Sequence, residues 1–147
     1  MSLHKRSGSA FVLVFVFGFI AGQAIKPRPT VAFAPSTDRV FELRKYTAPE
    51  GKLGELEARF RNHTIRIFNK HHMTSIGYFV PQDAPDSQNT LIYVLAHPSR
   101  EEAKKNWAAF QADPEWQKVN TESQVNGRIV TKVESTFMDP LDFSGIK

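Results

Sequence analysis

The stretch VFELRKYT, residues 40–47, decides the fold, because two kinds of side chain alternate along its length. In a β-strand, successive side chains point to opposite faces of the sheet. Glu42, Arg44 and Tyr46 then form a polar row on one face, and the opposite row begins with Phe41. The stretch therefore predicts a strand whose polar row either lines a pocket or fixes the pairing of the sheet.

The sequence downstream of this strand alternates helical and extended patterns. Apolar residues three or four positions apart predict a helix over residues 52–69. Extended patterns predict strands over 74–80 and 89–97, joined by a short polar loop that indicates a hairpin. A fourth strand is predicted over 128–137, after the turn formed by Asn126-Gly127.

Two capping signals predict further helices between the third and fourth strands. Ser99 can cap a helix with Glu102 as its capping-box partner. Asp113 can cap another, with Pro114 at the first helical position, where its missing N–H costs nothing. The order β-α-β-β-α-β with right-handed crossovers predicts an α+β fold, a ferredoxin-like antiparallel sheet with helices on one face.

This arrangement leaves one face of the sheet without helices. The strand over 89–97 is apolar on both sides, since Ile92 and Val94 alternate with Leu91 and Tyr93. Such a face is too apolar to meet water. We therefore expect a second copy of the chain to pack there, which gives a homodimer through the sheet face.

The N-terminus has the pattern of a secretory leader. Lys5 and Arg6 precede the apolar run AFVLVFVFGFIAG, residues 10–22, as a basic region precedes the apolar region of a signal peptide. The run is shorter than the roughly 20 residues of a spanning helix, so we expect cleavage after Ala24. An uncleaved membrane anchor is the alternative, while a mitochondrial presequence would be amphipathic and rich in arginine.

The chain thus divides into three parts. Because the first part resembles a secretory leader, we expect the protein to be exported to a periplasm or to the extracellular space. The parts are a signal peptide (1–24), a linker with three prolines (25–37) and a folded domain (38–147). A membrane contact is expected only through the first part, if it stays uncleaved.

Charge and cysteine content exclude several function classes. Residues 1–34 hold four basic and no acidic residues, and subtracting these four from 19 leaves 15 basic residues against 15 acidic ones. A neutral domain has little general attraction to phosphate, so nucleic acid is not an expected partner. The chain has no cysteine, which excludes disulfides, thiolate catalysis and cysteine metal sites.

Four short motifs, in this order, resemble the NIPSNAP family. They are FELRKY (41–46), GKL (51–53), His71 followed by IGYF (76–79), and DPEW (113–116). The resemblance covers residues 40–140, the whole predicted domain. It implies a dimeric α/β-barrel in which two ferredoxin-like sheets close face to face. It implies no shared reaction and no trafficking role for this chain.

The polar row of the first strand is the first candidate site. Arg44 could hold a carboxylate or an oxyanion, with Tyr46 as a second donor. The structural alternative is a Glu42–Arg44 pair that fixes the register, with Lys132 or Glu134 of the fourth strand as cross-strand partners.

Histidines form the second candidate group. His63, His71 and His72 lack the spacing of a metal site, so no metal is expected. His71 falls where the first helix should end, and a protonated imidazole is favourable there. His97 precedes a proline and is expected to be exposed.

Aromatic side chains form the third group. Tyr78, Tyr93, Trp107 and Trp116 could shape a cleft for a flat or apolar ligand. The structural alternative is ordinary core packing with the polar tips satisfied.

Two functions follow from these candidates, and neither needs a cofactor. The first is an exported binding or interaction module that takes a small apolar or aromatic ligand, with the ligand-binding candidates Glu42, Arg44, Tyr46, Tyr78 and Tyr93. The second is a cofactor-independent enzyme, monooxygenase- or isomerase-like, with His63 or His71 as the base and Arg44 holding the developing anion. Haem bound by one histidine is a third idea, resting on fold analogy alone.

Overall fold

The computed structural model describes residues 39–147, so the predicted leader, its cleavage site and the linker lie outside the described residues. The strands are β1 (Val40–Thr47), β2 (Thr74–Phe79), β3 (Thr90–His97) and β4 (Lys132–Met138). The α-helices are α1 (Leu53–Arg59), α2 (Ile65–Lys70), α3 (Arg100–Ala112) and α4 (Pro114–Glu122). A π-helical turn, η1 (Phe60–Thr64), joins α1 to α2, and a 3₁₀ turn, η2 (Asp86–Gln88), precedes β3.

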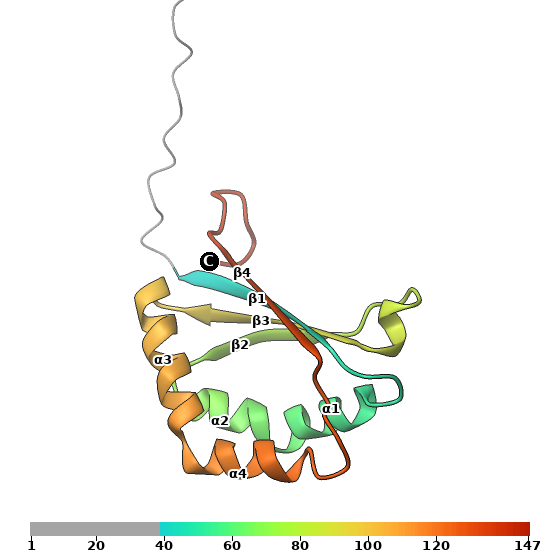
Figure 1. The fold of residues 1–147 in the computed structure, drawn as a ribbon. Coiled ribbons are helices and arrows are strands. Elements are labelled where there is room, and N and C mark those ends of the chain that lie inside the picture. Colours follow the sequence, from blue (N-terminus) through green and yellow to red (C-terminus); the bar gives the residue numbers. More distant parts are fainter. Residues whose placement is uncertain (1–38) are drawn as a thin grey trace, which may run out of the picture. The chain divides into compact units, whose positions relative to one another are not determined.

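The four strands form one antiparallel sheet in the order β2-β3-β1-β4, with the α-helices gathered on one side of it (Figure 1). This is the predicted β-α-β-β-α-β order of a ferredoxin-like fold. Strand β1 lies between β3 and β4, so its side chains have neighbours on both sides. Arg44 pairs with Tyr93 of β3 and with Ser135 of β4.

The polar row of β1 lies on the helix-covered face of the sheet. The ring of Tyr46 packs edge-on against Phe60, at 5.9 Å between centroids, and Glu42 bonds to Trp107 of α3. The alternate row, which begins with Phe41, lies on the other face. The alternation of the opening stretch therefore directs Glu42 and Arg44 inward, under the helices, and places Lys45 on the other face.

The first helical segment is built as its apolar spacing predicts, with one local difference. The residues spaced three or four positions apart are all buried; they are Leu53, Leu56, Phe60, Thr64 and Ile67. Within the run, the N–H of Ile65 donates to the carbonyl of Phe60, the hydrogen-bond spacing of a π-helix. The predicted single helix is thus α1, η1 and α2 in sequence.

Both predicted N-caps are present, but the reciprocal capping-box bond is not, and the Glu102 carboxylate pairs with Lys105 at 2.7 Å. The Ser99 hydroxyl accepts the N–H of Glu102 at 3.1 Å, and Asp113 accepts the N–H of Glu115 at 2.8 Å. Asp113 is buried and also accepts Lys70 Nζ at 2.7 Å and His71 Nε2 at 2.6 Å. These bonds join the end of α2 to the start of α4. The bond from Lys70, and after it the bond from His71, holds the pKa of Asp113 below its usual range.

The predicted start of the last strand and the predicted exposure of His97 are wrong. The last strand begins at Lys132 and not at residue 128, because its partner β1 ends at Thr47, whose carbonyl accepts Thr131 N–H at 2.8 Å. His97 is fully buried and not exposed. It follows Leu95 in the helix-facing row of β3, so the alternation of the strand carries it inward.

The helix-free face of the sheet is apolar and partly open. Ile76 and Phe79 of β2 and Met138 of β4 are 37%, 56% and 37% exposed. The ring of Phe79 lies over Gly77, where an added Cβ would come within 2.6 Å of the ring. The C-terminal segment, residues 139–147, runs beside this face and encloses with it a hollow of about 430 Å³.

The two ends of the described chain lie side by side (Figure 1). The guanidinium of Arg39, just before β1, donates from Nε to the backbone carbonyl of Lys147 at 3.1 Å. Among residues 39–147, no helix is both long enough and apolar enough to cross a membrane.

Candidate functional site

The carboxylate of Glu42 is buried at the centre of a hydrogen-bonded group, the Glu42 cluster, formed with Arg44, His97, Trp107 and Ser135. Oε1 accepts Arg44 Nη1 at 2.7 Å and Ser135 Oγ at 2.6 Å. Oε2 accepts Trp107 Nε1 at 2.6 Å and His97 Nε2 at 3.2 Å. One carboxylate thereby connects β1 to β3, to β4 and to α3.

The Glu42 cluster keeps its carboxylate ionised. Burial alone would raise the pKa of Glu42, but hydrogen bonds from His97, Ser135 and Trp107 and the charge of Arg44 lower it to about 2. His97 must donate from Nε2 to make its bond, and its buried Nδ1 has no partner among the described residues.

Arg44 is fixed in one orientation over an aromatic ring. Its guanidinium carbon lies 4.1 Å from the centroid of Trp107 and 5.5 Å from that of Tyr46, in the range of cation–π contacts. The Tyr46 hydroxyl is 3.4 Å from Nη2, and the buried Nε of Arg44 has no hydrogen-bond partner within residues 39–147. Glu42 and Trp107 therefore hold a charged group whose donors are not all used.

A pocket of about 500 Å³ opens beside this guanidinium, between α3 and the β1–β4 edge of the sheet; we call it the α3–β4 pocket. The residues that line it come from one face of α3 and from the two strands; they are Arg100, Lys104, Trp107, Ala108, Gln111, Glu42, Arg44, Ser135 and Phe137. Three of these side chains are cationic and one is anionic, so the lining carries an excess of positive charge.

The two helix cations of the α3–β4 pocket, Arg100 and Lys104, form no ion pair with the described residues. Neither Arg100 nor Lys104 has a carboxylate within ion-pair distance in the part of the chain that the structure describes. Arg100 lies over the ring of Phe137, with 4.5 Å from Cζ to the centroid. The pocket therefore combines aromatic walls with free positive charge.

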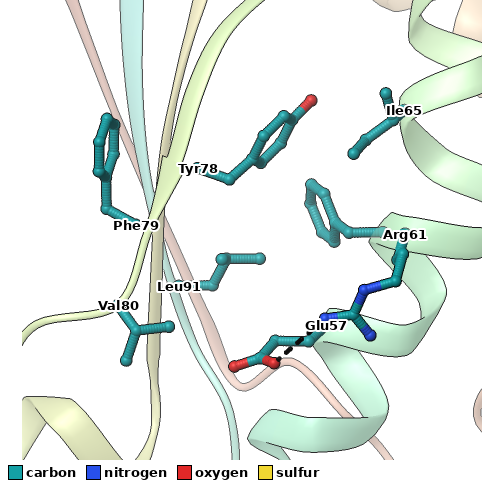
Figure 2. Close-up of a pocket in the computed structure, with 8 residues that line it drawn as sticks. Glu57, Arg61, Ile65, Tyr78, Phe79, Val80 and Leu91 are labelled. Carbon is teal, nitrogen blue, oxygen red and sulfur yellow. Dashed lines mark ion pairs between the residues drawn. The ribbon is translucent and has the colours of Figure 1, made fainter.

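A second pocket, of about 280 Å³, lies at the opposite edge of the sheet, between β2 and the α1–η1 helices; we call it the β2 pocket. Figure 2 shows Tyr78 and Leu91 directed toward the helices, while Phe79 leaves β2 on the other side. Its polar groups are already paired: Tyr78 bonds to Ser75 at 2.6 Å, and Glu57 pairs with Arg61 at 3.8 Å. The β2 pocket thus offers mainly apolar surface.

Comparison with known proteins identifies the family of the chain. The family model described as NIPSNAP matches residues 41–145. The chain belongs to the NIPSNAP family. The resemblance read from the sequence motifs is thereby confirmed, and with it the dimeric α/β-barrel as the fold of the family.

Solved structures of NIPSNAP proteins share this fold. A NIPSNAP family protein of unknown function from Agrobacterium tumefaciens is 22% identical, with 76% of this chain and 96% of that chain covered and a TM-score of 0.66. A NIPSNAP-like domain protein from Burkholderia xenovorans is 21% identical, with 74% and 90% covered and a TM-score of 0.65. A second A. tumefaciens family member is 25% identical, with 74% and 99% covered and a TM-score of 0.65. No curated protein matches the sequence.

The ligand-binding candidates of this NIPSNAP protein fall in three places. Glu42 and Arg44 line the α3–β4 pocket, and Tyr78 lines the β2 pocket. Tyr93 is fully buried in the core, where burial raises the pKa of its hydroxyl well above its ordinary value, and Tyr46 packs against its ring. The structure therefore unites two of the five candidates in one pocket.

The cross-strand partners proposed for the polar row are wrong. Lys132 and Glu134 pair with each other at 2.9 Å, and Glu134 stands opposite Lys45 in the register of β4, on the helix-free face. The fourth-strand residue that meets Glu42 is Ser135. The error is a shift of one residue in the register, which moves a side chain to the other face.

The histidine candidates do not join Arg44. His63 is exposed on η1, and His71 is bonded to Asp113. Neither lines the α3–β4 pocket. Within residues 39–147, no group of three or more potential ligands is arranged to hold a metal ion.

The sequence-based prediction did not include four residues of the Glu42 cluster and the α3–β4 pocket: His97, Ser135, Arg100 and Lys104. Alternation along β3 places His97 in the row of Leu95, so the sequence held a signal for it. Arg100 and Lys104 are four residues apart on one helix face, but only the position of α3 against β4 directs that face into a pocket.

Proposed function

We propose that this NIPSNAP protein is a homodimeric binding module that takes a small organic anion with an aromatic or apolar body. The observation that carries the proposal is the α3–β4 pocket, where Arg44 is held by a buried carboxylate beside two helix cations without partners. Small-molecule sites generally combine apolar walls with a few well-placed polar groups.

The cations supply recognition of a carboxylate. Guanidinium groups bind carboxylates through paired, charge-assisted hydrogen bonds. Glu42 neutralises Arg44 in part, so Arg100 and Lys104 supply the attraction that brings an anion into the pocket. Both are on exposed positions of α3, which lets them adjust to a ligand.

The aromatic groups supply the second half of the recognition. Trp107 and Phe137 line the same pocket as the cations, together with the small side chain of Ala108. A flat ring can pack on these surfaces while its carboxylate meets the cations. A neutral ring gains only the packing, so the proposal predicts discrimination by charge.

Fluorescence of Trp107 tests this proposal directly. The chain has two tryptophans, and Trp116→Phe leaves Trp107 as the only indole. We expect 1-naphthoate to change this emission saturably and the neutral 1-naphthamide to bind about tenfold more weakly, which corresponds to about 1.4 kcal/mol.

Charge-removing variants locate the binding. The double substitution Arg100→Gln and Lys104→Gln should weaken naphthoate by at least about tenfold, with little effect on naphthamide. Lys105→Gln is the matched control, because Lys105 pairs with Glu102 and does not line the pocket. Equal binding of acid and amide, or an unchanged double variant, would refute the proposal.

The enzyme hypothesis has weaker support. A general base must come within hydrogen-bond distance of the proton it removes. His63 and His71 lie outside the pocket of Arg44, and His97 is buried against Glu42. A binding role needs only the groups that the pocket contains.

Export of the protein is also part of the proposal, supported by the basic and apolar pattern of residues 1–24. N-terminal sequencing of the mature protein should then begin at about residue 25. An intact Met1 in a soluble cytosolic fraction would contradict export.

A further inference from the structure

Arg59, at the end of α1, is a buried cation that has no counter-ion among residues 39–147. The residue is 6% exposed, and no carboxylate in the described part of the chain lies within ion-pair distance of it. Its Nε is buried and has no hydrogen-bond partner. A buried charge in this condition is costly, and proteins rarely retain one without a partner.

The groups around Arg59 are neutral. Nη1 donates to Asn120 Oδ1 at 3.2 Å and to Ser123 Oγ at 3.4 Å, both long for bonds from a charged donor. The ring of Trp116 lies 5.1 Å from Cζ. Burial lowers the pKa of Arg59, as expected where desolvation is not offset by an anion.

A pocket of about 530 Å³ lies beside this guanidinium, between α1, η1 and α4; we call it the α1–α4 pocket. Asn62 and His63 of η1 line it with Arg59, and Asn126 lines it from the turn after α4. The π-helical turn begins directly after Arg59, and such turns are frequent at functional sites.

The two acidic residues that line this pocket do not neutralise Arg59. Glu55 pairs with Lys52 at 2.6 Å, and Glu122 lies 3.9 Å from Lys118. Their side chains are 45% and 63% exposed, so water and salt screen them. Their presence nevertheless disfavours a doubly charged ligand.

We propose that the α1–α4 pocket is a second binding site, in which Arg59 holds the carboxylate of a small monoanion. The carboxylate supplies the missing counter-charge to the guanidinium, and the amide groups of Asn62 and Asn126 can donate to its free oxygen positions. The site is separate from the α3–β4 pocket and uses none of its residues.

Nuclear magnetic resonance of the two indoles distinguishes the two sites. Trp116 lies under Arg59 and Trp107 lines the α3–β4 pocket, so each indole N–H reports on one of them. Acetate added to the full chain at constant ionic strength should shift the Trp116 indole signal saturably. Chloride at equal concentration should not. Trp116→Phe assigns the signal by removing it.

Arg59→Met is the decisive variant, because methionine can fill the buried space without charge. We expect it to weaken acetate binding at Trp116 by at least about tenfold. Arg61→Met is the control, since Arg61 is exposed on the same turn and lines the β2 pocket instead.

The wild-type titration decides the matter even if Arg59→Met fails to fold. No saturable shift of Trp116 with acetate would overturn the second site. Tighter binding of the phosphate dianion than of acetate would overturn its assignment to a carboxylate. A response confined to the Trp107 signal would be consistent with binding in the α3–β4 pocket and would refute the second site in the α1–α4 pocket.

Discussion

At the scale of single residues, Glu42 shows that a polar row can fix strand pairing and border a pocket at once. Its oxygens accept from Ser135 on β4 and His97 on β3, which locks the three strands in register. The same carboxylate orients Arg44 at the wall of the α3–β4 pocket. The two interpretations of the opening stretch are therefore compatible.

The depressed pKa of Glu42 predicts a specific pH dependence of stability. The folded-state value is about 2 against an ordinary 4.5, so the ionised carboxylate stabilises the folded state above about pH 4.5. That contribution, on the order of 3 kcal/mol, is lost as the pH falls from 4.5 toward 2. Replacement by an uncharged amide removes it at every pH.

Urea denaturation of Glu42→Gln tests this prediction. The variant should be less stable than the wild type by about 3 kcal/mol at pH 7, and the difference should shrink as the pH approaches 2. Glu101→Gln, on the exposed side of α3, is the control and should track the wild type. If the difference in unfolding free energy between the wild type and Glu42→Gln stayed constant with pH, the lost stability would come from packing and not from the ionised carboxylate.

At the scale of elements, local chemistry predicted most of the fold. Ser99 and Asp113 begin their helices as capping residues do, and the apolar spacing from Leu53 to Ile67 gave the buried face of the first helical run. The π-helical turn inside that run was not predicted. The N–H of Ile65 bonds to the carbonyl five residues earlier, but the buried residues keep a spacing that also fits an ordinary α-helix. The sequence pattern therefore does not indicate the π-helical turn.

The candidate site was less predictable than its elements, because pockets form between segments distant in the sequence. Arg44 and Glu42 could be selected from alternation alone. Arg100 and Ser135 carry no local signal, and they join the site because one face of α3 and the strand β4 line the same pocket. Arg59 is one arginine among many in the sequence, and only its burial without a carboxylate sets it apart.

At the scale of the whole molecule, the apolar helix-free face needs a cover. Phe79 and Ile76 are exposed there, and the C-terminal segment covers the face only in part. The fold of the NIPSNAP family supplies a geometry in which two such faces meet. We propose that the homodimer forms through this face.

Sedimentation tests the homodimer. The chain without residues 1–34 should sediment as a dimer at micromolar concentration, and Phe79→Glu should shift it to the monomer, because a buried charge in that interface has no partner. Gln82→Glu, exposed in the loop after β2, is the control and should leave the dimer intact. A stable wild-type monomer would contradict the paired faces.

The contact of Arg39 with the carbonyl of Lys147 bears on how the chain could be rearranged. Because the first and last described residues are neighbours, a short linker could join them without crossing the core. New ends could then be opened in the exposed loop between β2 and β3, which carries no residue of the α3–β4 or α1–α4 pockets. A circular permutant could therefore carry both candidate sites with the same elements in a different order along the chain.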